Sequence, residues 1–118
     1  MQVLNYGTYY NLNYLAEVSE GDSKFMHELT KTFVNQTPAM VNELKSAVYN
    51  NNYERTKFLA HKLKSSCEIL GMQFSAGICL KIELAALHNR NLTALIDDLE
   101  VLVHQLFVST YELEKSAA

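Results

Sequence analysis

Proline and glycine are scarce in this sequence, and their scarcity limits the fold class. The 118 residues include one proline and four glycines. An all-β domain of this length needs many tight turns, which these residues normally form. Hydrophobic residues make up 48% of the chain, which is enough for one buried core. The sequence therefore favours a single helical domain over residues 1–118.

Long apolar runs and basic clusters are also missing. No stretch approaches the roughly 20 apolar residues that cross a bilayer. The N-terminal sequence lacks the basic and apolar regions of a signal peptide. We therefore expect a cytoplasmic protein that has no membrane partner. The ten Lys and Arg residues are spread along a chain of net charge −3, which argues against a nucleic acid partner.

Enzyme and metal motifs are absent as well. Cys67 and Cys79 form no CxxC pair, and we interpret both as small buried apolar residues in a reducing compartment. The four histidines are scattered without a second metal ligand nearby in sequence, so we expect no metal site. There is no Gly-rich phosphate loop, no HExxH and no nucleophile turn. The chain is expected to act without ATP and without a cofactor of its own.

Hydrophobic residues recur at spacings of three and four in most of the chain, which is the helical period. The pattern predicts a short helix at 12–18 and longer helices at about 23–49, 53–70, 73–87 and 92–115. Four amphipathic helices with short loops pack most simply as an antiparallel up-down bundle. We therefore expect an all-α four-helix bundle over about residues 22–115 with a short extra N-terminal helix. Residues 1–11 are polar and tyrosine-rich, and we expect them to be loosely held.

Local signals mark the expected helix ends. Asp22 and Asn91 are suitable N-caps, and Gly71 follows a helix where a left-handed residue ends it at low cost. Pro38 does not reset the apolar period around it, so we favour one kinked helix at 23–49 over two helices broken at Thr37–Pro38. The aromatic residues assigned to the inner faces are Phe25, Phe33, Phe58 and Phe107.

His61 has the most informative surroundings of the four histidines. On a helix, residues three and four apart share a face, so His61, Lys64 and Ser65 lie together and Glu68 lies one turn further on. The apolar stripe of Leu59, Leu63, Cys67 and Leu70 takes the opposite side. A neutral imidazole directed away from the core is a nucleophile, and a lysine one turn away can balance phosphate charge. A lone His–Lys pair, however, is more often an ordinary polar helix face.

The wider segment resembles the signature of histidine-containing phosphotransfer (HPt) domains, the intermediates of multistep two-component phosphorelays. The residues that carry the resemblance are His61, Leu63, Lys64, Ser65, Ser66, Cys67, Leu70 and Gly71. The segment with Phe25, Leu29, Phe33, Thr37–Pro38 and Leu44 resembles the family's first long helix, and Cys79 with Ile82–Glu83 resembles its third. The resemblance covers about residues 12–107.

The resemblance implies a role for each matching residue. His61 would be phosphorylated at Nε2, Lys64 would stabilise the phosphoryl group, and Glu83 would hydrogen-bond the histidine and set its tautomer. A solvated helix residue is an alternative interpretation of Glu83. Ser65 replaces the family's usual glycine, and it would either hydrogen-bond the phosphate or crowd the partner. Ser65, Glu68 and Gln36 are candidates for receiver docking, although Gln36 also fits an ordinary boundary residue.

The function implied is that of a monomeric phosphocarrier with no independent catalytic activity. Its partners would be receiver domains of response regulators and hybrid histidine kinases, and the receiver would supply Mg²⁺. Three alternatives stay open at this stage. The chain would be a receiver-binding adaptor without transfer, the phosphoacceptor domain of a larger hybrid sensor kinase, or a helical adaptor unrelated to phosphorelays.

Overall fold

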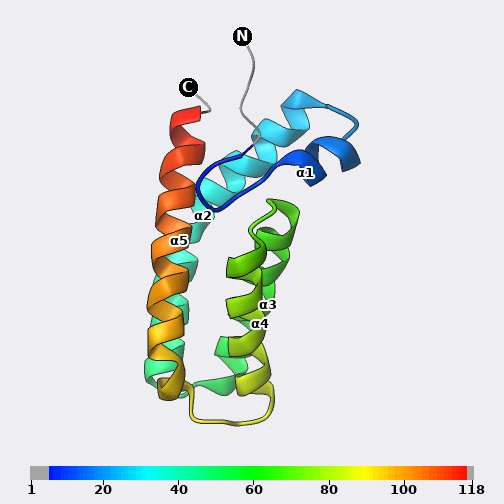
Figure 1. The fold of residues 1–118 in the computed structure, drawn as a ribbon. Helices are drawn as coiled ribbons and strands as arrows, with labels where there is room; N and C mark the ends of the chain where they lie inside the picture. Colours follow the sequence, from blue (N-terminus) through cyan, green and yellow to red (C-terminus); the bar gives the residue numbers. More distant parts are fainter. Residues whose placement is uncertain (1–5, 117–118) are drawn as a thin grey trace.

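Helices make up nearly all of the computed structural model, which describes residues 6–116 (Figure 1). In chain order they are α1 (Asn13–Val18), α2 (Ser23–Tyr49), α3 (Tyr53–Ile69), α4 (Gln73–Leu87), the 3₁₀ helix η1 (Leu92–Leu95) and α5 (Ile96–Ser116). No β-strand occurs among the described residues, which show only an isolated bridge between Tyr6 and Asn11. The predicted all-α class is confirmed.

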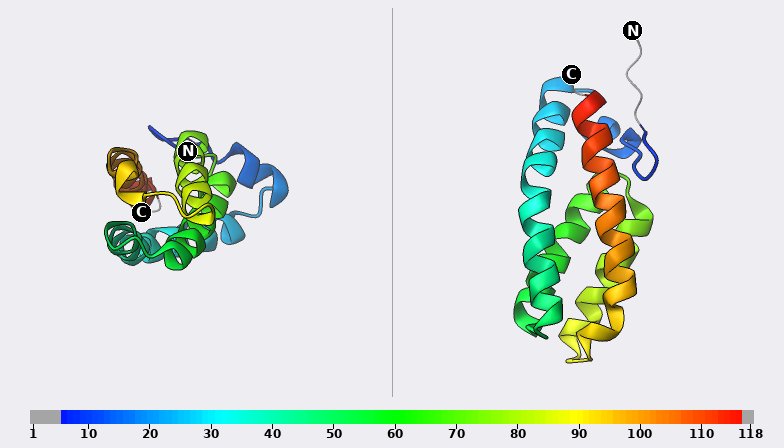
Figure 2. Two further views of the ribbon diagram at one scale, coloured as in Figure 1. Left: turned by 90° about the horizontal axis from the view of Figure 1, so that it is seen from below. Right: turned by 90° about the vertical axis from the view of Figure 1, so that its left-hand side faces the viewer.

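The four long helices run antiparallel to their neighbours in an elongated bundle of 48 × 23 × 19 Å (Figure 1). Helices α2 and α5 lie side by side along its full length, while α3 and α4 form a shorter hairpin beside them (Figure 2). Helix α1 and the segment before it cover the end of that hairpin at the turn between α3 and α4 (Figure 1). No helix within residues 6–116 is both long and apolar enough to cross a membrane.

The helices begin and end at the residues whose side chains or backbone suit those positions. The side chain of Asp22 accepts a hydrogen bond from the Phe25 N–H, and that of Asn52 accepts one from Arg55. Gly71 follows α3 with φ +66°, a left-handed conformation that side chains disfavour. Asn91 caps η1, which replaces the first turn of the expected last helix.

Pro38 lies inside α2 without ending it. Its ring leaves no N–H for the carbonyl of Val34, one turn earlier. The neighbouring Thr37 hydroxyl donates to the Phe33 carbonyl at 2.6 Å, so a hydrogen bond from a side chain to the backbone is also present in that turn. The preference for one helix over two is confirmed.

The core runs the length of the bundle and includes side chains from every helix. Three of the four aromatic assignments to it were wrong, because Phe25, Phe58 and Phe107 are about half exposed and only Phe33 is buried. Each of the three lies at the border of the apolar stripe of its helix. The hydrophobic period of the sequence places such a residue near the core, but it does not show whether a neighbouring helix covers the side chain. Cys67 and Cys79 are buried free thiols, as expected.

The segment before α1 also differs from the expectation of a loosely held terminus. Residues 1–5 lie outside the described part, but residues 6–12 are fixed to the bundle. Tyr10 and Leu12 are buried, and the Asn11 N–H donates to the Leu70 carbonyl at 3.1 Å. The Thr8 hydroxyl and N–H both donate to the Glu112 carboxylate on α5. Composition alone missed this because tyrosine and leucine pack readily within otherwise polar sequence.

Candidate functional site

His61 lies on α3 with its side chain 62% exposed, directed away from the core as expected. The preceding residue, Ala60, and the next leucine, Leu63, are fully buried. This alternation follows from the helical period, since α3 presents one face to α4 and the opposite face to solvent. The imidazole therefore projects from a rigid helix rather than from a loop.

Glu83 on α4 reaches across the hairpin to His61. The Nδ1 atom of His61 lies 2.9 Å from Oε2 of Glu83, whose side chain is only 18% exposed. Because an ionised carboxylate only accepts hydrogen bonds, Nδ1 must carry the hydrogen. The Nε2 atom then keeps its lone pair. The alternative interpretation of Glu83 as a solvated helix residue was wrong.

Lys64 completes the cluster from one turn along α3. Its Nζ atom lies 2.9 Å from Oε1 of Glu83, so the two carboxylate oxygens are divided between the lysine and the histidine. Burial raises the pKa of Glu83, but hydrogen bonds from Lys64 and His61 outweigh it, and the net pKa lies below the ordinary value. The same hydrogen bond raises the pKa of Lys64. The lysine and the carboxylate are thus both charged near neutral pH.

Ser65 and Glu68 lie next to this cluster on α3, as their spacing predicts. The Ser65 hydroxyl donates to the His61 carbonyl at 3.3 Å, so it bonds back along its own helix. Both residues line an open hollow of about 460 Å³ together with Tyr14, Ile69 and Gln73. The extra helix α1 therefore contributes a side chain beside the candidate site.

Gln36 lies apart from the cluster. It is exposed on α2 and lines a small hollow of about 70 Å³ with residues of α2 and α3 that include Phe33, Ser66 and Ile69. No interaction between Gln36 and His61, Lys64 or Glu83 is found in the described part of the chain. Its docking role stays a prediction that this geometry does little to support.

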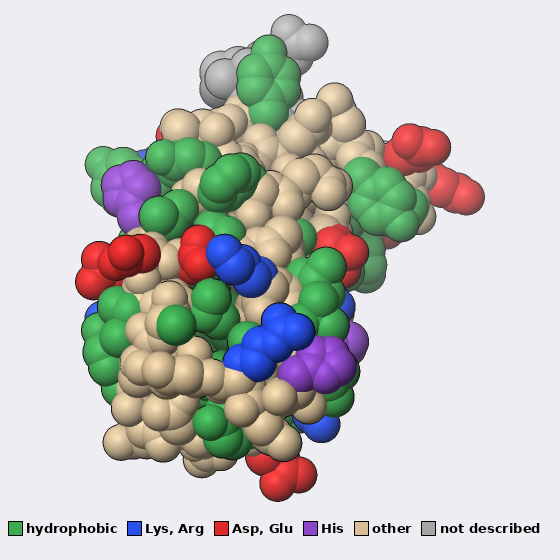
Figure 3. Space-filling view, turned by 60° about the horizontal axis from the view of Figure 1, so that its bottom comes forward, with side chains coloured by type: hydrophobic (Ala, Val, Ile, Leu, Met, Phe, Trp, Pro, Cys, Tyr) green, Lys and Arg blue, Asp and Glu red, His purple; other side chains and the backbone are tan. Residues whose placement is uncertain are grey.

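Exposed leucines around the cluster were missed by the sequence reasoning. Leu80 and Leu84 flank Glu83 on α4, and Leu87 lies one turn beyond. Phe58 lies one turn before His61 on α3 and is 54% exposed. The sequence of α4 did indicate these exposed leucines. Apolar residues occur on all sides of this helix, and because only one face can be buried against the bundle, some of them must be exposed. Elsewhere, at the end of the bundle opposite α1, hydrophobic and charged side chains also lie intermixed on the surface (Figure 3).

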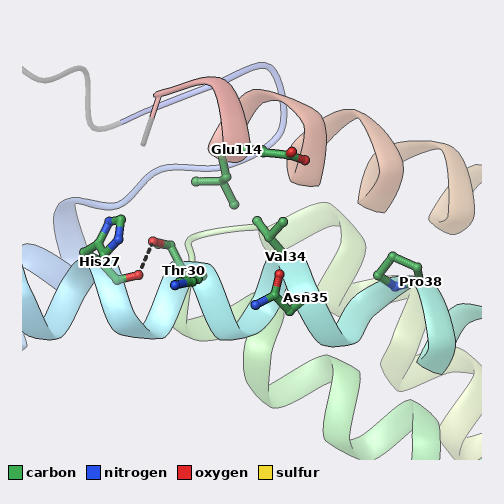
Figure 4. A pocket seen from close by; sticks show the side chains of 8 residues that line it. His27, Thr30, Val34, Asn35, Pro38 and Glu114 are labelled. Carbon is green, nitrogen blue, oxygen red and sulfur yellow. Dashed lines mark hydrogen bonds between the residues drawn. The ribbon is translucent and has the colours of Figure 1, made fainter. Parts of the chain in front are cut away.

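A separate hollow of about 480 Å³ lies between α2 and the C-terminal part of α5. His27, Val34, Asn35 and Pro38 line it from α2, and Glu114 lies across from them on α5 (Figure 4). The Thr30 hydroxyl donates to the His27 carbonyl there. Lys31 and Glu114 also line the hollow, but among the described residues neither forms a hydrogen bond or ion pair with His27 like those that join His61, Lys64 and Glu83.

The comparison with protein families decides the identity of the fold. The chain matches the model of the Hpt domain over residues 28–113. It belongs to the Hpt domain family. Hpt domains are phosphocarriers in two-component phosphorelays, so histidine phosphotransfer is the function class of this chain. A helical adaptor unrelated to phosphorelays is therefore the wrong alternative.

Individual relatives agree with this family. The sensor protein TorS of Escherichia coli (strain K12) is 30% identical over 84 residues, which cover 68% of this chain and 9% of TorS. Two solved structures share the fold at 18% sequence identity. The HPT domain of a sensor hybrid histidine kinase from Shewanella has a TM-score of 0.79, with 90% of this chain and 91% of that chain covered. Histidine-containing phosphotransfer protein B from Pseudomonas aeruginosa PAO1 has a TM-score of 0.81, with 95% and 96% covered.

Proposed function

We propose that His61 is the phosphorylated residue of this Hpt domain, and that it carries a phosphoryl group between the aspartates of two receiver domains. The observation that supports this most is the bond from His61 Nδ1 to Glu83, which leaves the exposed Nε2 with a free lone pair. Among the four histidines, His61 combines exposure with a carboxylate that sets its tautomer.

The transfer step follows from this geometry. The Nε2 lone pair attacks the phosphorus of an aspartyl phosphate, the N–P bond forms, and the acyl O–P bond breaks as the aspartate leaves with its electron pair. The ring keeps the hydrogen on Nδ1 and so becomes cationic while phosphorylated. The Glu83 carboxylate, 2.9 Å from Nδ1, stabilises that charge. The reverse step returns the phosphoryl group to a second receiver.

The proposal divides the chemistry between two proteins. This chain supplies an oriented nucleophile, and the receiver supplies the aspartate, the Mg²⁺ and the groups that stabilise the transferring phosphoryl. The chain then has no catalytic activity alone and no cofactor of its own. We expect it to act as a monomer in the cytoplasm, where receiver domains would meet it.

The surface around His61 suits a docking protein. Phe58 and the exposed leucines of α4 offer apolar contact within a turn of His61 and Glu83. Ser65 and Glu68 extend this surface into the hollow beside Tyr14. Helix α3 has four basic and two acidic residues, which favours a partner with an acidic face such as a receiver's phosphorylated site.

A place within a larger hybrid kinase is the second candidate. It is favoured by the relationship to TorS, of which this chain spans about a tenth of the length. The chemistry at His61 would be the same, with one receiver supplied by the same polypeptide. A third candidate, a receiver-binding adaptor without transfer, would apply if Ser65 obstructs docking.

Incubation with a receiver domain carrying a radiolabelled phosphoryl group tests the proposal. We expect label on the chain that is labile to acid and stable to base, as phosphohistidine is. The His61→Gln variant should take up no label and keep its helical fold, whereas His104→Gln should be labelled normally. Label that persists in His61→Gln would move the site to another histidine. Binding of the receiver without any labelling would favour the adaptor.

A further inference from the structure

Gly77 differs from the other three glycines of the chain, all of which lie within residues 6–116. Gly21 and Gly71 have φ angles of +75° and +66°, which side chains rarely adopt. Gly7 lies so close to the ring of Tyr10 that a Cβ atom would collide with it. Gly77 has neither property. Outside its own stretch of helix, no described atom lies within 4 Å of the position that its Cβ atom would take.

A glycine at this position weakens the helix that carries Glu83. In a helix interior glycine is less favourable than every residue except proline, because it has the most backbone freedom to lose. Gly77 lies in the middle of α4 and is exposed, so alanine would fit there and would make the helix more stable. Packing within the domain therefore does not require this glycine. Close approach of another molecule would require it, because a Cβ atom would hold that molecule away from the backbone.

The side chains around Gly77 are apolar and exposed. Leu80 and Leu84, one and two turns further along α4, are 42% and 41% exposed. Phe74, one turn before Gly77, is 68% exposed. Spacings of three and four place these residues on the same side of the helix as Gly77. Gly77 is thus a low point within a row of larger apolar side chains, and the row continues to the leucines that flank Glu83.

The same side of α4 adjoins the hollow next to the candidate site. Gln73 lines that hollow, of about 460 Å³, together with Tyr14, Ser65 and Glu68. Gln73 lies one turn before Gly77, so the open space over Gly77 and the hollow are neighbours. The surface around the candidate site therefore continues across α3 to the outer side of α4.

A receiver domain is the partner whose position fits this surface. Hpt domains act with receiver domains in phosphorelays, so a receiver must lie over His61 during transfer. A stable interface covers about 800 Å² on each partner, which corresponds to a disc with a radius of about 16 Å. Gly77 precedes Glu83 by six residues, which is about 9 Å along α4. A receiver centred on His61 therefore reaches Gly77.

We propose that the receiver domain packs an apolar part of its surface directly on Gly77, and that this contact determines how closely it approaches α4. The inference rests on the proposed function of His61. Gly77 touches no phosphoryl group, and its role is to let the receiver seat with its aspartyl phosphate in line with Nε2. A side chain at Gly77 would lift or tilt the receiver and lengthen the distance from Nε2 to phosphorus, to which the transfer rate is sensitive.

The first experiment compares stability with receiver affinity in Gly77→Ala, Gly77→Gln and the control Ala39→Gln, which adds the same side chain on the exposed face of α2. Both Gly77 variants should melt about 2–6 °C above the wild type, because they strengthen the helix. Affinity for the receiver should fall by about threefold in Gly77→Ala and by about tenfold or more in Gly77→Gln. The control should keep the wild-type affinity to within about twofold.

The second experiment separates docking from the reactivity of His61. Phosphoramidate labels an accessible histidine without a receiver, because its P–N bond breaks and ammonia leaves as the new N–P bond forms. The initial rate with a phosphorylated receiver, divided by the rate with phosphoramidate, isolates the contribution of docking. In Gly77→Gln this ratio should fall by about tenfold, while in Ala39→Gln it should equal that of the wild type.

Three outcomes would count against these proposals in different ways. Wild-type affinity and a wild-type rate ratio in Gly77→Gln would overturn the inference. Lower melting temperatures in both Gly77 variants would overturn it as well, because they would show that the fold itself requires the glycine. Failure of the wild type to accept label from either donor would refute the proposed function of His61, and the affinities would still decide whether the receiver packs on Gly77.

Discussion

The two halves of the bundle carry different tasks. The α3–α4 hairpin consists of helices of 17 and 15 residues and contains His61, Lys64 and Glu83. Helices α2 and α5 have 27 and 21 residues and contribute none of the three. Charge differs too, since α3 has more basic than acidic residues while α5 has five acidic residues and one lysine.

This difference shows how a bundle supports a small site. The hairpin alone defines the distances among three reacting or orienting side chains, because both helices are rigid and antiparallel. The longer helices cover the inner face of the hairpin. A buried hydrogen bond from Ser75 on α4 to Gln105 on α5, 2.6 Å long, fixes one half against the other. Mutations in the α3–α4 hairpin and mutations in α2 or α5 should therefore affect phosphotransfer differently.

The largest expected effects come from truncating the core in each half. Ile82→Ala in α4 and Leu106→Ala in α5 both remove fully buried side chains. Each should cost about 2–5 kcal/mol of unfolding free energy, measured by denaturant titration. At a temperature where both variants are folded, only Ile82→Ala should slow phosphotransfer, because it loosens the helix that positions Glu83. Equal slowing by Leu106→Ala would mean that the whole bundle positions the site.

Glu83→Ala should give the next largest effect. It leaves the His61 ring without its orienting partner, and transfer should slow by about 10-fold to 100-fold, as expected for misplacement of a reacting group. The measurement is the initial rate of labelling by a charged receiver. Glu100→Ala removes an exposed carboxylate from α5 and should transfer normally. A normal rate in the Glu83 variant would remove this residue from the mechanism.

Ser65 tests where the docking surface lies. Ser65→Gln places a long side chain beside the hollow that Tyr14 and Glu68 line, and it should weaken receiver binding and transfer together with little change in melting temperature. Ser65→Gly should keep transfer and lose at most about 1 kcal/mol of stability. Ala39→Gln on the exposed face of α2 is the matched control. Normal binding by Ser65→Gln would place the interface elsewhere.

The smallest effect concerns stability against pH. The folded pKa of Glu83 is lowered, so its ionisation stabilises the native state at pH values above the ordinary pKa of a glutamate. This contribution is lost as the pH falls from that value through the lowered pKa of the folded state. The melting temperature of the wild type minus that of Glu83→Gln should therefore decrease on acidification. In a Lys64→Met background the same difference should depend less on pH. An equal slope in both backgrounds would show that Lys64 does not set the pKa of Glu83.

Local signals in the sequence predicted most of the fold. Helix ends depend on hydrogen bonds between residues about three apart, such as those made by Asp22, Asn52 and Gly71. The predicted ends of α2, α3 and α4 therefore agree with the structure to within about one residue. The period also placed His61 outside the core. It did not decide which border residues a neighbour covers, which is why Phe25, Phe58 and Phe107 were misassigned.

The site was predicted less completely, because its side chains come from residues that are far apart in the sequence. The resemblance pointed to Lys64 and Glu83 separately, but their ion pair joins residues on two helices and depends on how α3 and α4 align. The hydrophobic period of one helix does not show how that helix aligns with its neighbour. The capping of the Leu92 N–H by the Asn51 side chain was invisible for the same reason.

The segment of residues 6–12 has a consequence for anyone who trims this domain for expression. The family match begins at residue 28, yet the Asn11 N–H bonds to the Leu70 carbonyl, and a side chain at Gly71 would collide with the Asn11 carbonyl oxygen. The turn that joins α3 to α4 therefore packs against a segment that lies outside the range of the family match. A boundary placed at the start of the family match would remove the Asn11 N–H that bonds to the Leu70 carbonyl, together with the buried side chains of Tyr10 and Leu12. For this chain, the folded domain begins well before the residues that the family model matches.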